Sequence, residues 1–213
     1  MRLKIAALTL IFALCTISSY AAERVGLYLE GTKHQRGGEA IAQRTANLYV
    51  YDGCKVKAYD QSKIWAHDNC VVEAYGQTTV TANANTKIEA HDTTRVLASN
   101  LANIEAYGSP NVVADQQCKV SAHGNTSVHA KDRVKVDADG NCTIFARDKV
   151  EVKATGDCIV MALGNSVIEA KGRVHVKAYE NSTVNASEDA VVESWGSAKV
   201  NAQGNVKVEK HKQ

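Results

Sequence analysis

One group of positions in this sequence carries rings and carboxylates at a constant spacing. Five ring-bearing residues follow one another every sixteen positions, and a glutamate lies two positions before three of them. The rings belong to Tyr59, Tyr75, His91, Tyr107 and His123, and the carboxylates to Glu73, Glu89 and Glu105. Flat rings beside regularly spaced carboxylates suit the binding of an extended glycan, or of another repetitive polymer, by stacking and hydrogen bonding. The alternative is that the ring ladder and the exposed acids only stabilise the surface of a sheet.

The same glutamates are the residues that a carbohydrate-active enzyme would use. Glycoside hydrolysis needs two carboxyl groups flanking the scissile bond, and covalent catalysis needs a nucleophile beside a base. Neither arrangement has a distinctive motif here, and the repeat described below has no inserted loop in which catalytic groups could gather. We therefore expect no catalytic residue, and keep a carbohydrate-active β-helix enzyme as the alternative.

A second series of positions with the same spacing is largely apolar. It runs through Trp65, Thr81, Leu97, Val113, His129, Phe145 and Met161. An apolar stripe on an exposed sheet often marks a contact surface. Trp65, Leu97, Val113, Phe145 and Met161 are therefore candidate protein-contact residues, including contacts with a second copy of the chain in a homo-oligomer. The segment from Glu23 to Asn47 is an alternative cover for this stripe.

Five cysteines remain when Cys15 is set aside with the N-terminal segment, and all five occupy one repeating position: Cys54, Cys70, Cys118, Cys142 and Cys158. In an exported protein, Cys54 with Cys70 and Cys142 with Cys158 are candidate disulfides. The other interpretation is that cysteine is here a small buried residue, interchangeable with Thr, Ala and Val at the same position. Paired cysteines with zinc-ligand spacing are absent, and the sequence predicts neither a metal nor a cofactor.

The elements that would position these residues follow from an eight-residue repeat. Every eighth residue from Leu48 to Val208 is Leu, Val or Ile, and from Ala58 to Ala202 the second residue after it is Ala, except at Ser194. The aliphatic and Ala positions share one face of a strand because strand side chains alternate between faces. A Gly, Asp or Asn then tolerates left-handed backbone angles, so each unit is one short strand followed by one turn.

A longer period of sixteen residues indicates how the units are stacked. Seven of ten turn positions taken every sixteen residues from Asp60 are Gly, whereas the alternate set from Asp52 has two. This favours an all-β fold, a two-sided parallel β-solenoid (β-helix) of ten coils with about sixteen residues each. An antiparallel meander is the competing fold, but it needs a second layer to bury its aliphatic face.

Three parts of the chain are predicted. Residues 1–22 combine early cations, an apolar run and a small-residue end, which is typical of a secretory signal peptide. Residues 23–46 lack the repeat and predict an N-terminal cap, with a strand around Val25 to Leu29 and a short helix over 38–43. Residues 47–213 are the β-solenoid repeat domain, and Lys207, Lys210 and Lys212 place charge on its last strand.

The charge balance limits the classes of partner. A net charge of +2, with 25 basic and 23 acidic residues, gives no reason to expect a nucleic-acid partner. The apolar run at the N-terminus is too short for a bilayer, so we expect no transmembrane segment in the mature chain. The expected location is exported: periplasmic, associated with the cell surface, or secreted.

The units Val72-Glu73-Ala74-Tyr75-Gly76 and Ile104-Glu105-Ala106-Tyr107-Gly108 resemble the octad repeats of bacterial exported β-solenoid proteins, including adhesin-like surface proteins. The resemblance covers residues 47–209 and concerns the fold. It implies a surface or periplasmic role by analogy only. The leading hypothesis is a non-catalytic structural or binding scaffold, an adhesin-like module that meets a glycan or a protein surface through the Tyr/His ladder. The alternatives are a carbohydrate-active enzyme and a self-associating structural rod.

Overall fold

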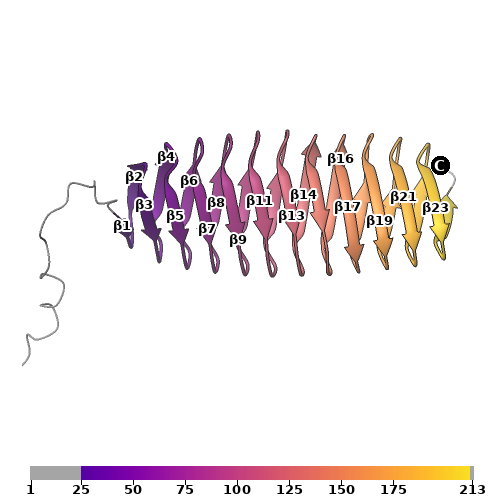
Figure 1. Cartoon of the computed structure of the whole chain (residues 1–213), viewed down its shortest axis with the longest axis horizontal. Helices are drawn as coiled ribbons and strands as arrows, with labels where there is room; N and C mark the ends of the chain where they lie inside the picture. The colour runs from indigo at the N-terminus through magenta and orange to yellow at the C-terminus, as the bar shows by residue number, and fades with distance from the viewer. Residues whose placement is uncertain (1–24, 212–213) are drawn as a thin grey trace, which may run out of the picture.

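The chain is a straight two-sided β-solenoid (Figure 1), described here from a computed structural model. The structure describes residues 25–211, so the expected signal peptide (1–22) and Lys212 lie outside the described residues. Within residues 25–211 there are twenty-four strands in two parallel sheets of twelve strands each. At the usual strand spacing this makes a rod roughly 55 Å long. The predicted fold class, a parallel solenoid with sixteen residues per coil, is confirmed.

Sheet A contains the odd-numbered strands: β1 (Val25–Tyr28), β3 (Glu39–Ala42), β5 (Lys55–Ala58), β7 (Val71–Ala74), β9 (Lys87–Ala90), β11 (Asn103–Ala106), β13 (Lys119–Ala122), β15 (Lys135–Ala138), β17 (Glu151–Gly156), β19 (Val167–Gly172), β21 (Thr183–Glu188) and β23 (Lys199–Gly204). Sheet B contains the even-numbered strands: β2 (Thr32–Arg36), β4 (Asn47–Tyr51), β6 (Lys63–Ala66), β8 (Thr79–Ala82), β10 (Arg95–Ala98), β12 (Asn111–Ala114), β14 (Ser127–Asp132), β16 (Thr143–Asp148), β18 (Ile159–Ala162), β20 (His175–Ala178), β22 (Val191–Trp195) and β24 (Lys207–His211).

The core lies between the two sheets and follows from the alternation of the repeat. In β9, for example, Ile88 and Ala90 are fully buried, while Lys87 is exposed and Glu89 half-buried. Each strand therefore adds one branched aliphatic and one alanine to a continuous apolar layer. Full burial of one such aliphatic contributes roughly 1.5–3 kcal/mol, so stability grows coil by coil.

The turns use left-handed backbone angles in each unit, as predicted, at one position or, as at Asp52 and Gly53, at two successive positions. Asp60 has a φ of 63° and Gly124 a φ of 74°. Glycine clusters at this position where successive coils come close. A Cβ on Gly124 would lie 2.9 Å from the carbonyl oxygen of Gly108, one coil below. The preference for glycine every sixteen residues therefore reflects contact between coils as well as backbone angle.

The N-terminal segment adds strands to the solenoid, and the helix predicted over residues 38–43 is wrong. Residues Glu39–Ala42 form β3, which pairs with β5. Strand β1 pairs with β3 at an offset of 39 − 25 = 14 residues. Strand β2 pairs with β4 at an offset of 47 − 32 = 15 residues. These offsets break the eight-residue period, and Ala40 in β3 stands where the repeat has a branched aliphatic residue. The sequence therefore predicts ten coils from Leu48 onward, whereas each sheet has twelve strands.

The first coil also closes the N-terminal end of the core. The Tyr28 side chain packs against the buried residues, and its hydroxyl donates to Oε1 of Gln35 at 2.9 Å. Nε2 of Gln35 donates to the carbonyl oxygens of Gly37 (3.1 Å) and Glu39 (2.9 Å). Polar groups at this end therefore satisfy one another above the apolar layer.

Candidate functional site

The five predicted ring residues form one continuous ladder along the side of sheet A where its strands end. Each ring residue directly follows a strand, from Tyr59 after β5 to His123 after β13. Ring centroids are separated by 5.3 Å (Tyr59 to Tyr75), 4.7 Å (Tyr75 to His91), 5.3 Å (His91 to Tyr107) and 4.9 Å (Tyr107 to His123). The interplanar angles lie between 4° and 15°. We call these five residues the ring ladder.

The turns position the ring ladder through hydrogen bonds from small buried side chains. The Thr78 hydroxyl donates to the carbonyl oxygen of Tyr75 at 2.7 Å, and the Thr94 hydroxyl donates in the same way to His91 at 2.7 Å. Ser62 and Thr126 hold the carbonyls of Tyr59 and His123 at 2.8 Å. Each ring backbone except that of Tyr107, whose turn contains Pro110, is thus fixed by a hydroxyl three residues later.

The three glutamates form a row beside the ring ladder. Glu89 is the register partner of both Glu73 and Glu105 on neighbouring strands. Lysines partly balance this row: Lys57 Nζ lies 3.1 Å from Glu73 Oε2, and Lys87 Nζ lies 3.4 Å from Glu89 Oε1. The hydrogen bond with Glu73 raises the pKa of Lys57, so this lysine remains a cation.

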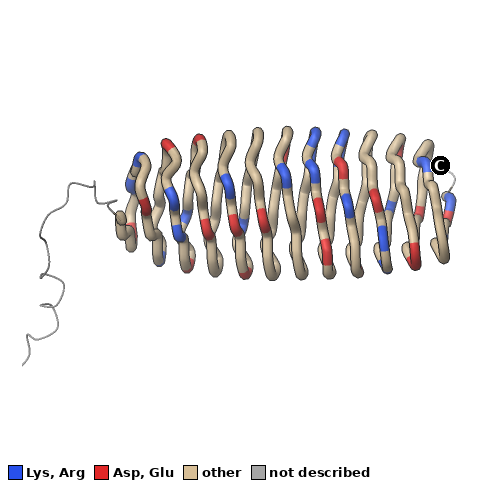
Figure 2. Tube along the Cα trace, viewed as in Figure 1, with Lys and Arg blue, Asp and Glu red and all other residues tan. Residues whose placement is uncertain are grey.

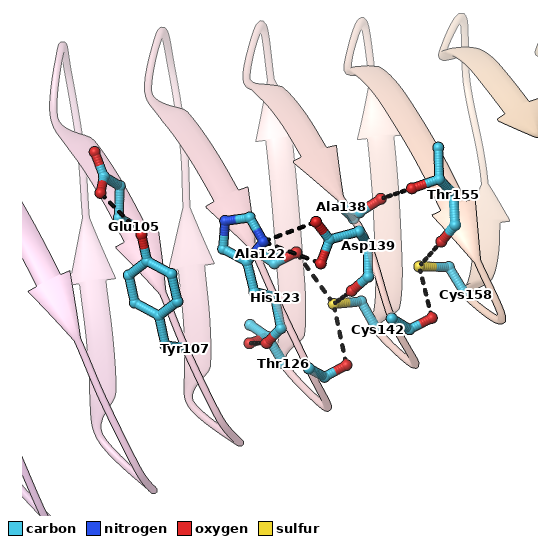
Figure 3. A network of polar contacts seen from close by, with 12 residues as sticks. Glu105, Tyr107, Ala122, His123, Thr126, Ala138, Asp139, Cys142, Thr155 and Cys158 are labelled. Carbon is cyan, nitrogen blue, oxygen red and sulfur yellow. Dashed lines mark hydrogen bonds and ion pairs between the residues drawn. The ribbon is translucent and has the colours of Figure 1, made fainter.

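Two tyrosines of the ladder connect the rings to the carboxylates. The Tyr107 hydroxyl donates to Glu105 Oε2 at 3.1 Å (Figure 3), and Tyr75 donates to Glu73 Oε2 at 3.4 Å. The bond to Glu105 raises the pKa of Tyr107, and burial followed by the charge of Glu73 raises that of Tyr75. Both phenols therefore keep their protons and act as donors at neutral pH.

The stacking decides which surfaces of the rings a ligand can reach. Each of the inner rings, Tyr75, His91 and Tyr107, has a neighbouring ring on both faces. Those faces are not open to a sugar, so the stacking part of the sequence hypothesis does not fit this geometry. The hydroxyl and imidazole edges and the carboxylates remain for hydrogen bonding.

The predicted apolar stripe is continuous in register on sheet B. Strand pairing places Trp65 beside Thr81, Val113 beside His129, and Phe145 beside Met161. The His129 and Phe145 rings stack at 4.6 Å, and Val113 is 36% exposed. Strands β2 and β4 extend the end of this sheet, so the N-terminal segment does not cover the stripe, and Tyr49 stacks on Trp65 at 4.5 Å.

All five cysteines lie in the predicted inward position, fully buried and as free thiols. Cys142 and Cys158 donate to the carbonyl oxygens of Asp139 and Thr155, each at 3.1 Å (Figure 3), in the same way as the turn threonines. Burial raises the pKa of Cys54 to about 12 and that of Cys118 to about 11. Such thiols are poor nucleophiles, which fits the interpretation of cysteine as a small buried residue.

Two further features were missed by the sequence reasoning. A second stack joins Tyr179, Trp195 and His211, with centroid distances of 4.6 and 4.5 Å, and the sixteen-residue spacing would have revealed it. A cluster of cations at one turn edge, described below, was also missed. Within residues 25–211, no group of three His, Cys, Asp or Glu side chains is placed to hold a metal ion. No helix in the same range is long and apolar enough to cross a membrane.

The comparisons with known proteins add no relative to this description: no family model, no curated protein and no solved structure matches the chain.

Proposed function

We propose that the chain is a non-catalytic, exported binding scaffold, adhesin-like in role, whose ring ladder contacts an extended glycan or a protein surface. The observation that carries the proposal is the unbroken ladder of five stacked rings beside a row of three glutamates. Like charges opposite one another on neighbouring strands are destabilising. A row of three glutamates is therefore better explained by a ligand than by stability of the sheet alone.

Recognition on this face would proceed by hydrogen bonding at the ring edges. Tyr75, His91 and Tyr107 present one polar edge per coil, and neighbouring coils lie about 4.8 Å apart. The glutamates add an acceptor to each of three coils. A polymer lying along the rod axis would meet a polar ring edge and a carboxylate on each successive coil, so weak bonds would add up.

The arrangement of the glutamates supports binding over catalysis. Glu73, Glu89 and Glu105 project from one side of one sheet, in a row along the rod. The two carboxyl groups of a glycosidase must lie on opposite sides of the scissile bond. The alternative of a carbohydrate-active enzyme has no such opposed pair among these residues.

The apolar stripe supports a second candidate function, a rod that associates with other copies of itself. The stripe residues remain in register over consecutive strands of sheet B and include the exposed Val113. Sedimentation of the parent chain and of a Trp65→Ser variant tests this function. A parent chain that is already monomeric at high concentration contradicts it.

Glycan-array binding combined with a polymer-turnover assay on the mature chain tests the leading function. Tyr75→Phe and Glu89→Gln remove polar edge groups while keeping the ring stack and the side-chain volume. We expect each to weaken binding of the best array ligand by about threefold to tenfold, the range for loss of one exposed hydrogen bond.

Tyr179→Phe, in the separate stack on sheet B, is the matched control and should leave binding unchanged. Polymer cleavage that disappears in Glu89→Gln would reject the scaffold in favour of the enzyme. Binding that is equally strong in all variants would place the ligand elsewhere.

Export is part of the proposal and has its own test. Residues 1–22 are expected to be removed as a signal peptide, leaving the chain in the periplasm, at the cell surface or in the medium. Fractionation of expressing cells, followed by N-terminal sequencing of the mature chain, checks both points. Recovery of the full-length chain in the cytoplasm would contradict export.

A further inference from the structure

A group of exposed cations lies at the edge where the coils turn from sheet B into sheet A. Arg133 occupies the turn between β14 and β15, and Lys149 occupies the same position one coil later, between β16 and β17. Lys119 and Lys135 are the first residues of β13 and β15. We call these four residues the basic edge. Figure 2 shows the cations at the turn tips of two adjacent coils near the middle of the rod.

The basic edge surrounds a shallow hollow of about 420 Å³. Besides the four cations, Leu101, Gln117 and Glu151 line it. Leu101 lies on the same turn edge and is 57% exposed, so its apolar side chain is available for contact beside the cations. The hollow thus combines concentrated positive charge with an uncovered apolar group.

Like charges face one another at this edge. Lys119 is the register partner of Lys135, and nearby Lys131 is the register partner of Arg147. Opposite charges are register partners at other positions, as for Lys153 and Glu169, whereas like charges recur in the glutamate row beside the ring ladder. Like charges directly opposite one another are destabilising. A local departure of this kind is expected where a site serves a partner instead of the stability of the fold.

Few direct ion pairs balance this charge, although Asp132 and Asp148 precede Arg133 and Lys149 on the same turns. Among residues 25–211, Lys135 is the one member of the basic edge in an ion pair, 2.9 Å from Glu151. On the same turn edge, the residues equivalent to Arg133 and Lys149 on the coils either side are the neutral Gln117 and Asn165. The positive charge is therefore confined to a short stretch of the rod, and a short anionic partner fits it better than one that follows the whole length.

We propose that the basic edge is a docking site for an acidic segment of a partner protein, with an apolar side chain of that segment packed on Leu101. Charge complementarity supplies the attraction and the orientation, and the exposed leucine favours a peptide over a purely polar polyanion. The site is separate from the ring ladder, because Lys119 begins β13 whereas His123 follows its end. Both surfaces can be occupied at the same time.

Fluorescence anisotropy with two short labelled peptides tests the proposal on the intact mature chain. One peptide consists of glutamates with a central leucine, and the other has serine in place of that leucine. We expect the parent chain to bind the leucine peptide more tightly. The double variant Arg133→Glu/Lys149→Glu should weaken binding by at least about tenfold, because two attractions become repulsions. Leu101→Ser should abolish the preference for leucine.

The matched control is Lys63→Glu/Arg95→Glu, which changes the net charge by the same amount at two exposed cations on sheet B. It should leave the affinity within about twofold of the parent value. Equal weakening in both double variants would reduce the effect to net charge and overturn the proposal. Tighter binding of a sulfated glycan or duplex DNA to the basic edge, unaffected by Leu101→Ser, would also overturn it. Absence of peptide binding to the parent chain would do the same.

Discussion

The carboxylate of Asp139 contacts His123, the last residue of the ring ladder. Nδ1 of His123 lies 2.9 Å from Oδ2 of Asp139, which occupies the next coil (Figure 3). A carboxylate thus replaces the ring that would otherwise follow. Beyond this point the same position holds Thr155 and Lys171, so the ring ladder is confined to the first half of the rod. The ring ladder therefore ends because residues without rings occupy the equivalent positions of the later coils, and not because the rod ends.

The ring ladder is expected to stabilise the fold as well as to bind. Tyr75→Ala removes stacking contacts with Tyr59 and His91, each worth roughly 0.5–1.5 kcal/mol, so we expect a loss of about 1–3 kcal/mol in the free energy of unfolding. Tyr75→Phe keeps both contacts and removes only the long hydrogen bond to Glu73 (3.4 Å), so it should lose about 0.5 kcal/mol. Urea unfolding followed by circular dichroism checks the two values. An equal loss in both variants would show that the hydroxyl, and not the stacking, stabilises this face.

The Thr78 hydroxyl is expected to stabilise the folded chain by the usual contribution of one buried hydrogen bond. Thr78→Val keeps the volume but leaves the carbonyl of Tyr75 without its 2.7 Å donor, which should cost about 1–2 kcal/mol. Thr78→Ser keeps the donor and loses one buried methyl group, at about 0.8 kcal/mol. The denaturation midpoints of the two variants give the comparison. If Ser destabilised the chain more than Val, the turn would depend on packing of the methyl group instead of the hydroxyl.

Gly124 and Gly53 separate the two reasons for glycine in the turns. Both have left-handed backbones, with φ of 74° and 72°. An alanine Cβ at position 53 meets nothing within 4 Å, whereas at position 124 it lies 2.9 Å from the Gly108 oxygen. Gly53→Ala should cost about 1–2 kcal/mol from backbone strain alone. Gly124→Ala should cost measurably more in thermal or urea unfolding. Equal costs would mean that neighbouring coils separate easily.

The buried thiol of Cys118 makes the stability depend on pH in the alkaline range. Burial raises its pKa from 9.0 to about 11 in the folded chain. Between these values the unfolded chain loses a proton that the folded chain keeps. The contribution of the protonated thiol to the free energy of unfolding is therefore fully present below pH 9 and decreases as the pH rises towards 11. The slope is at most about 1.4 kcal/mol per pH unit.

Cys118→Ala removes this titration, and alanine already fills the equivalent position at Ala102. Unfolding measured at several pH values should therefore show a shallower alkaline loss in the variant. Parallel pH curves for parent and variant would contradict the role of Cys118, because every other titratable group is the same in both chains.

The sequence alone determined the coil and the direction of each side chain within it. Strand alternation is a local property, and each coil repeats the contacts of the coil below. A period of eight therefore predicted that Ile88 faces the core and Glu89 the solvent, and a period of sixteen predicted that Tyr75 lies beside His91. Both relationships are present in the structure.

The tertiary structure decided what periodicity does not carry. Ring faces became inaccessible because neighbouring coils lie close enough for the rings to stack on one another. Residues Glu39–Ala42 became a strand and not a helix because β5 offered hydrogen bonds in the sixteen-residue register, although Ala40 stands where the repeat has a branched aliphatic residue. The sixteen-residue spacing places Arg133 and Lys149 on adjacent coils, but only the structure shows that they line one hollow with Lys119 and the exposed Leu101. In each case the deciding interaction acts between coils, and it depends on how closely their side chains and backbones pack, which the period alone does not give.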